Sequence, residues 1–134
     1  MANYDALIKK ANDARSNSYA PYSTYRVGAA LLCADGTVYT GCNVENAAYG
    51  ETVCAERIAV FKSISEGKRD FEAISIVGGI DEPKDFAYPC GACRQVLSEF
   101  CAPTLKIVLF DGENAKLCTL GELFPASFGK ASIK

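Results

Sequence analysis

The chain has 134 residues, of which 49% are hydrophobic, and its 14 basic and 16 acidic residues give a net charge of −2. This length suits one core, so we expect residues 1–134 to form a single domain. The charge gives no general attraction to nucleic acid or to an anionic membrane, so a small, weakly charged partner fits better. No apolar leader or membrane-spanning run is present, and the odd number of cysteines, seven, indicates reduced thiols. A soluble cytoplasmic protein is therefore expected.

The first elements are a helix and a hairpin. Apolar residues at helical spacing predict an amphipathic helix from about Tyr4 to Ala14. Residues 26–34 and 37–43 then read as two antiparallel strands. Between them Asp35-Gly36 suits the positive backbone angles of a two-residue turn.

A second helix is expected in the middle of the chain. Thr52 can cap it, it would run to about Glu66, and Gly67 would end it. Its apolar face is expected to use Ile58, Ala59, Phe61 and Ile64.

The second half alternates strand and helix patterns. In order it predicts a buried strand, a helix, a strand and, after a turn, another strand, at residues 71–79, 91–101, 105–110 and 115–119. Thr119 with Glu122 is a capping-box pattern for a short last helix, which Pro125 would end.

The order of these elements predicts the fold class. Helices that alternate with strands require crossover connections, and crossovers place helices on the faces of a sheet. We therefore expect an α/β protein with three layers, α/β/α, in which a mixed five-stranded sheet is covered by helices on both faces.

Three cysteines form a candidate metal site. Alone, "PCGAC" fits a redox couple, half a zinc site or two packed thiols. Cys54, however, also begins a predicted helix, as Cys90 and Cys93 do, and helix N-termini stabilise the thiolates that bind metal. A redox pair has no use for a third cysteine. Three thiolates leave one position open on a tetrahedral zinc ion, as in catalytic sites, where zinc brings the pKa of bound water to about 7.

Two charged residues stand beside Cys54. Glu56 is the candidate general acid and base for the water, and its alternative is a solvated glutamate stabilised by the helix dipole. Arg57 lies at i+3 from Cys54, where it could donate to sulfur and offset the negative charge of three thiolates. Its alternative is an exposed helix arginine.

These residues resemble a known family. "CAE" with "PCGAC" resembles the signature of zinc deaminases. Together "YSTYRVGAAL", "GCNVENAAYGETVCAER" and "PCGACRQVLSEF" are similar to small cytidine deaminases that act on free nucleosides, a resemblance that spans Tyr22 to Phe128. It implies one zinc ion per subunit on the three cysteines and attack of hydroxide on C4 of cytosine. Glu56 would protonate N3, help ammonia leave and yield uridine or deoxyuridine, a reaction of pyrimidine salvage.

The resemblance also implies a nucleoside pocket. Asn43 and Glu45 would hold the ribose, the ring of Tyr25 would pack on the base, and the backbone amide of Ala55 would bind the base carbonyl. Glu45 would also repel a phosphate at the sugar, which favours a free nucleoside. The alternative for "GCNVEN" is a turn after a strand.

Family members of this length are usually homotetramers, which implies that Tyr49 and Phe128 reach into a neighbouring subunit's site. Both could instead pack on their own core. Three positions depart from the usual pattern: Tyr25 stands where phenylalanine is common, Arg26 puts the local loop geometry in doubt, and Glu51 could change a subunit contact.

Three other functions are weighed. A non-catalytic zinc module would close its site with a fourth cysteine, although the four remaining ones, Cys33, Cys42, Cys101 and Cys118, read as small core residues. A deaminase of a modified cytosine nucleoside, such as a nucleoside antibiotic, would keep the chemistry and change the pocket. A polynucleotide editor would ordinarily need a basic surface, which this chain lacks.

Overall fold

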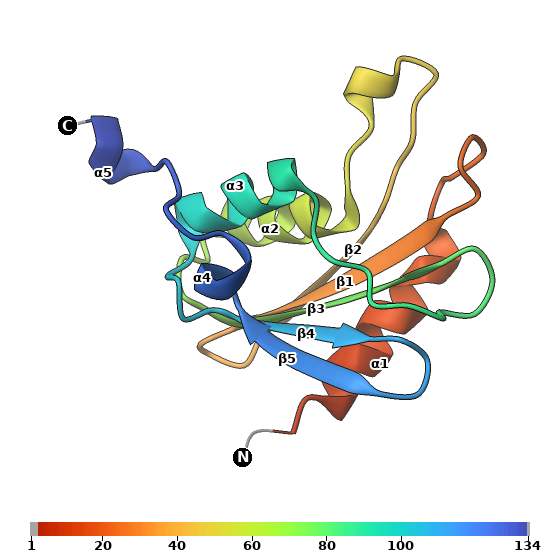
Figure 1. The fold of residues 1–134 in the computed structure, drawn as a ribbon, viewed down its shortest axis with the longest axis horizontal. Coiled ribbons are helices and arrows are strands. Elements are labelled where there is room, and N and C mark those ends of the chain that lie inside the picture. Colours follow the sequence, from red (N-terminus) through yellow and green to blue (C-terminus); the bar gives the residue numbers. More distant parts are fainter. Residues whose placement is uncertain (1–2, 134) are drawn as a thin grey trace.

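The computed structural model describes residues 3–133, which build one five-stranded sheet with helices on both sides (Figure 1). The strands are β1 (Arg26–Cys33), β2 (Val38–Cys42), β3 (Phe71–Gly79), β4 (Lys106–Phe110) and β5 (Ala115–Thr119). The α-helices are α1 (Asp5–Ala14), α2 (Ala55–Ser65), α3 (Gly91–Phe100), α4 (Leu120–Leu123) and α5 (Lys130–Ile133). Two 3₁₀ turns, η1 (Arg15–Asn17) and η2 (Tyr49–Glu51), complete the described elements.

The sheet is mixed, in the order β2-β1-β3-β4-β5. β3 and β4 are parallel, and the other neighbouring strands are antiparallel. α1 covers one face, while α2 and α3 cover the other (Figure 1). The predicted three-layer α/β/α architecture is therefore confirmed. Among residues 3–133, no helix has the length and apolar character that a membrane crossing requires.

Alternating residues of the strands contribute side chains to two hydrophobic cores, one on each face of the sheet. The core under α2 and α3 contains Leu31, Ile74, Ile76, Leu97, Ile107 and Leu109, all fully or almost fully buried. The core under α1 is smaller and combines Leu7, Ile8 and Ala11 with Ala30, Val77 and Val108 from the strands. The period of two in a strand sends neighbouring residues such as Ala30 and Leu31 to opposite faces.

Two glycines bring helices close to the sheet. A Cβ on Gly28 would lie 1.9 Å from the carbonyl oxygen of Ala11, so α1 packs directly on the β1 backbone. A Cβ on Gly41 would lie 2.5 Å from the carbonyl oxygen of Ala55. Gly41 therefore lets the first turn of α2, next to Cys54, rest on β2.

The first hairpin differs from the predicted two-residue turn. The amide of Cys33 donates to the carbonyl of Thr37 at 2.9 Å, which leaves three residues, 34–36, in the loop. Gly36 supplies the positive φ, 92°, that such a loop needs after its turn. The prediction placed Gly36 in the turn correctly, but the loop has three residues rather than the predicted two.

The start and the face of α2 also differ from the prediction. Thr52 is not the cap: α2 begins after Cys54, because Val53 is held extended by two hydrogen bonds with Val44, of 2.9 and 3.0 Å. Phe61 was expected to face inward but is 47% exposed. Small residues and Val60 fill the inner face instead, namely Ala55, Ala59, Val60 and Ser63, because α2 lies close to the sheet.

The predictions for the second half are confirmed. The strand and helix patterns correspond to β3, α3, β4 and β5, with boundaries that shift by one residue at most. Thr119 and Glu122 form a capping box at α4, which ends before Pro125. The sequence pattern did not indicate α5, a single turn near the chain end.

Candidate active site

The three candidate cysteines meet where α2 and α3 begin. Cys54 is the N-cap of α2, Cys90 is the N-cap of α3, and Cys93 lies in the first turn of α3. Their sulfur atoms lie within 4.8 Å of one another. Cys54 Sγ is 3.6 Å from Cys90 Sγ, which is 3.4 Å from Cys93 Sγ. The predicted thiol cluster is thus present.

This donor set fits zinc. Ligands on a tetrahedral zinc ion with Zn–S bonds of about 2.3 Å lie about 3.8 Å apart, close to the sulfur distances in the cluster. Thiolate ligands bind zinc in preference to magnesium or calcium. The cluster contains three sulfurs, so it leaves one position on the ion for water or substrate.

Arg57 approaches the cluster as expected. Its Nη2 donates to Cys54 Sγ at 3.6 Å and to the carbonyl of Thr52 at 3.3 Å. Its Nε is buried without a partner among the described residues. The thiolate raises the pKa of the guanidinium through this hydrogen bond. A cation therefore sits against the sulfurs and stabilises their negative form.

The thiols themselves are polarised by this arrangement. The pKa of Cys54 is lowered because the Cys93 thiol and then Arg57 donate hydrogen bonds to its sulfur. The pKa of Cys93 is raised, since as the donor it keeps its proton and since it is buried. These contacts favour the thiolate form at Cys54.

Glu56 is buried beside the thiols. It follows Cys54 by two residues, is only 4% exposed, and lines a cavity together with Cys54 and Cys90. Burial raises its pKa to about 7, and the negative charge of Cys54 adds to this shift. The solvated first-turn glutamate considered above is therefore excluded. A carboxyl group that titrates near neutral pH can both take up and release a proton.

The cavity has a volume of about 320 Å³. Three of the predicted substrate residues, Tyr25, Asn43 and Ala55, line it. The remaining walls are mostly apolar or aromatic and come from β1, β3 and the two loops before α2 and α3: Val27, Thr52, Ile76, Phe86, Ala87 and Tyr88. A small apolar cavity with a few polar groups at one end is typical of small-molecule sites.

Asn43 shapes the rim of this cavity. Its Oδ1 accepts from the amide of Val27 at 2.9 Å, and its Nδ2 donates to the carbonyl of Tyr25 at 2.8 Å. The side chain thus continues the pairing of β2 with β1 and fixes the backbone on which Tyr25 stands. Its amide has a second proton and a second lone pair left for a ligand.

Glu45 lies outside this cavity. It lines a neighbouring hollow of about 370 Å³ with Tyr22, Ser23 and Tyr49, and Thr52 borders both spaces. Its carboxylate accepts from the amides of Tyr22 and Ser23 at 3.0 and 3.1 Å and from the Ser23 hydroxyl. The hydroxyl is the main cause of its lowered pKa. The structure therefore orders Glu45 as an anion next to the cavity.

Tyr49 and Phe128 do not line the cavity. Tyr49 lies in η2, is 76% exposed and packs edge-on against Tyr22, with 5.9 Å between the ring centres. Phe128, between α4 and α5, is 60% exposed, and its carbonyl accepts from Gln95 Nε2 at 2.9 Å. Packing on their own core, the alternative considered above, is therefore not observed.

The other four cysteines stand apart from the cluster. Among the described residues the group of potential ligands is confined to Cys54, Cys90 and Cys93. Cys33 and Cys118 are buried, while Cys42 and Cys101 are partly buried. Burial raises the pKa of Cys101 to about 12. None of them closes the site, which contradicts the non-catalytic zinc module.

Sequence reasoning missed part of the site. Phe86 and Tyr88 line the cavity, although their segment reads as a polar loop; two aromatics just before "PCGAC" were the available signal. Arg15 is buried and donates to the carbonyls of Arg26, at 3.0 Å, and Gly79, at 2.9 Å, which ties η1 to β1 and β3. Its partners are carbonyls, which leave no trace in the sequence.

An open three-thiol site with a buried carboxyl group in a small cavity defines a zinc-dependent hydrolytic site. Comparison with known proteins identifies the family. The family described as cytidine and deoxycytidylate deaminase zinc-binding region matches residues 1–109. This chain belongs to the cytidine and deoxycytidylate deaminase family.

Proteins of high similarity agree with this assignment. The chain is 49% identical over 124 residues to a cytidine deaminase of Halalkalibacterium halodurans, with 91% of each protein covered. It is 44% identical over 130 residues to a cytidine deaminase of Sporosarcina psychrophila, which covers 96% of this chain and 93% of that protein. The crystal structure of cytidine deaminase from Burkholderia pseudomallei superposes with a TM-score of 0.87 at 46% identity and covers 95% of this chain and 100% of that one.

Proposed function

We propose that this chain is a zinc-dependent cytidine deaminase, which converts free cytidine and deoxycytidine to uridine and deoxyuridine with release of ammonia. The observation that carries the proposal is the position of Glu56, buried in the cavity two residues from a thiol of the zinc site. The family assignment and the names of the relatives support it.

The zinc site supplies an activated water as the nucleophile when Cys54, Cys90 and Cys93 hold the ion. Glu56 moves the protons: it accepts one from the water and delivers it to N3 of the cytosine ring. After the hydroxyl group has added at C4, the same carboxylate takes the proton of that hydroxyl and passes it to the amino group; the C4 carbonyl forms as the C–N bond breaks and ammonia leaves. Its pKa of about 7 suits both directions of transfer. Arg57 offsets the negative charge of the thiolates.

The cavity walls hold the base. Ala55, in the first turn of α2, lines the cavity. Its backbone amide is proposed to donate to the base carbonyl. The ring of Tyr25 packs on the base, which keeps the role expected of an aromatic residue there. Asn43 uses its free amide proton for a sugar hydroxyl.

Glu45 selects for a free nucleoside. Its ordered carboxylate lies in the neighbouring hollow, which shares Thr52 with the cavity. From there it accepts a hydrogen bond from the sugar. A phosphate at the same place would bring two negative charges together, which costs binding energy.

The active unit is proposed to be a homotetramer. Tyr49 and Phe128 are exposed aromatic side chains outside their own cavity, and such residues favour protein interfaces. In the assembly they would complete the sites of neighbouring subunits. We further propose that residues 1–134 act as a single domain and that the protein serves pyrimidine salvage in the cytoplasm, where zinc-binding thiols stay reduced.

The test is direct conversion. Purified, zinc-loaded protein is incubated with cytidine, deoxycytidine and cytidine monophosphate, and the products are separated by chromatography. We expect uridine and deoxyuridine to form and the monophosphate to stay unchanged. If zinc is bound and neither nucleoside reacts, the proposal is wrong in its substrate, and modified cytosine nucleosides become the next class to assay.

A further inference from the structure

One wall of the cavity is a loop with few internal ties. Residues 80–89 connect β3 to α3 and place Phe86, Ala87 and Tyr88 against the cavity. Within the described residues, no backbone–backbone hydrogen bond involves this segment, which we call the wall segment. A loop that lacks such bonds depends on side chains for its position.

Three cationic side chains from three different elements hold the wall segment. Arg15 of η1 donates to the carbonyl of Asp81 at its start. Arg94 of α3 donates through Nε to the carbonyl of Pro89 at its end, at 2.8 Å. Lys116 of β5 donates to the hydroxyl of Tyr88 at 2.7 Å.

Lys116 differs from the two arginines in what else it holds. Arg15 also binds Arg26 and Gly79, and Arg94 also donates to the carbonyl of Leu123 in α4. In residues 3–133, the polar contacts of the Lys116 side chain are confined to the wall segment. Its ammonium group lies 5.3 Å from the ring centre of Tyr88 and 5.8 Å from that of Phe86, within reach of a cation–π interaction.

The strand register explains why Lys116 reaches this place. Side chains two residues apart share a face of a strand, so Lys116 points to the same side as Cys118, which is buried in the core under α2 and α3. β5 is one of the two edge strands of the sheet, and Lys116 is exposed there. It can therefore lean over the sheet edge toward the wall segment without displacing a core residue.

We infer that Lys116 is a positioning residue, which holds the aromatic wall formed by Phe86 and Tyr88 against the base of the substrate. It touches neither the base nor the zinc site, and it acts through the two aromatic side chains. The inference rests on the proposed function for its effect on substrate, while the position of the wall segment can be tested without any substrate.

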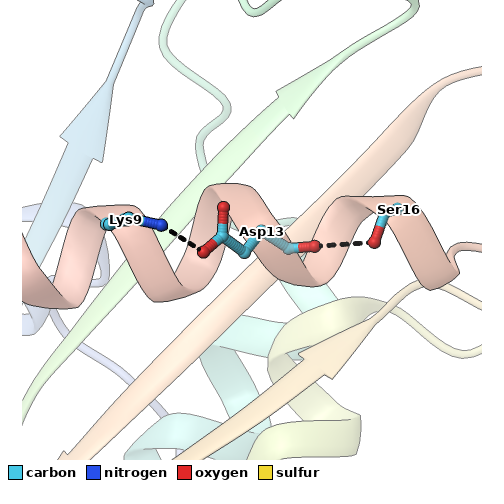
Figure 2. Close-up of polar contacts among 3 residues, drawn as sticks. All are labelled: Lys9, Asp13 and Ser16. Atoms are coloured by element: carbon cyan, nitrogen blue, oxygen red, sulfur yellow. Dashed lines mark hydrogen bonds and ion pairs between the residues drawn. The ribbon is translucent and has the colours of Figure 1, made fainter.

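Four variants separate the contact between Lys116 and Tyr88 from the general effect of removing a surface lysine. Lys116→Met removes the ammonium group and keeps the length of the side chain, Lys116→Arg keeps a donor and a charge, and Tyr88→Phe removes the acceptor. Lys9→Met is the matched control. Figure 2 shows Lys9 on α1 paired with Asp13, with 2.7 Å between Nζ and Oδ2. α1 covers the face of the sheet opposite α2 and α3 (Figure 1).

Two measurements report the position of the wall segment: KM for cytidine and the rate of proteolytic cleavage within the segment. We expect Lys116→Met to raise KM for cytidine about two- to fivefold while kcat and zinc content stay unchanged, the scale of a partly exposed charged contact. Cleavage by a lysine-specific protease after Lys84, an exposed residue in the wall segment, should accelerate by about the same factor because the segment opens more often. In Lys116→Arg, KM for cytidine and the cleavage rate after Lys84 should both stay close to the parent values.

Tyr88→Phe should reproduce both changes, and adding Lys116→Met to it should have little further effect, as expected for two residues that act through one contact. Unchanged cleavage at Lys84 in Lys116→Met, relative to Lys9→Met, would overturn the inference. So would faster cleavage with an unaltered KM in an active parent protein. If the parent protein does not convert cytidine, the proposed function fails, and the cleavage rates still decide whether Lys116 holds the wall.

Discussion

The two faces of the sheet differ in whether they bury a carboxyl group. The core under α1 consists of apolar residues together with Ser75, a fully buried β3 residue whose Oγ has no hydrogen-bond partner among the described residues. On the outer side of α1, Lys9 pairs with Asp13, and the Ser16 hydroxyl of η1 donates to the Asp13 carbonyl (Figure 2). On the other face Glu56 is buried. Burying such groups costs stability, so the contrast separates a face that packs from a face that does chemistry.

The topology explains why the second face carries the site. β2 and β3 both run antiparallel to β1, so they point the same way, and α2 and α3 follow them. Both helices therefore begin at the same end of the sheet, and their N-termini bring three thiols together. α1 precedes β1 and has no such neighbour (Figure 1).

The largest effect is expected from Glu56→Gln. The amide keeps the size of the side chain but cannot transfer protons, so kcat should fall about 10²- to 10⁴-fold. Zinc content and melting temperature should stay near the parent values. Turnover at the parent rate, measured with cytidine and bound zinc quantified in the same sample, would show that another group moves the protons.

A smaller effect is expected from Arg57→Gln. Loss of the cation beside Cys54 should weaken zinc binding about 10- to 100-fold, the range for residues that support metal ligands. Zinc affinity is measured by competition with a chelator of known strength. Arg69→Gln is the control, because Arg69 donates to the carbonyls of Ile64, in the last turn of α2, and Lys68, far from Cys54. Equal affinities in the two variants would contradict the role of Arg57.

On the packing face, Leu7→Ala should change stability and leave the chemistry intact. Leu7 is buried under α1, and such truncations cost about 2–5 kcal/mol of unfolding free energy. Denaturant unfolding measures this loss. Below the unfolding transition, zinc content and kcat of the folded protein should equal those of the parent. A variant that folds but loses zinc would show that the two faces are coupled.

The smallest effect is expected from Lys9→Ala. The pair with Asp13 lies on the exposed side of α1, and i,i+4 pairs contribute about 0.3–0.5 kcal/mol. The change in melting temperature should be slight and should vanish at high salt, where such pairs are screened. A salt-independent loss above 1 kcal/mol, roughly the upper end for exposed pairs, would mean that α1 is stabilised by more than packing.

The sequence predicted those parts of the site that lie within short segments. Cys54 and Glu56 stand at the start of one helix, and Cys90 and Cys93 at the start of another, so local pattern and chemistry located them. The position of Glu45 beside the cavity, rather than in it, depends on Ser23 and the Tyr22 amide, which the sequence did not connect to it.

What the sequence could not predict depends on contacts between distant elements. Phe61 was expected in the core, but the close approach of α2 at Gly41 leaves room only for smaller side chains. The sequence predicts a loop at the wall segment but not what holds it in place, because the donors of Arg15 and Lys116 come from distant parts of the chain. Neither residue belongs to a motif.

The ligands of the bound zinc ion provide the most direct test of the account. X-ray absorption of the zinc-loaded protein gives the number of sulfur and lighter neighbours of the metal. We predict three sulfurs at about 2.3 Å and one oxygen or nitrogen at about 2.0 Å, the open site that hydrolytic chemistry needs. Four sulfurs would mean that another cysteine closes the site, and the proposed deaminase would be contradicted.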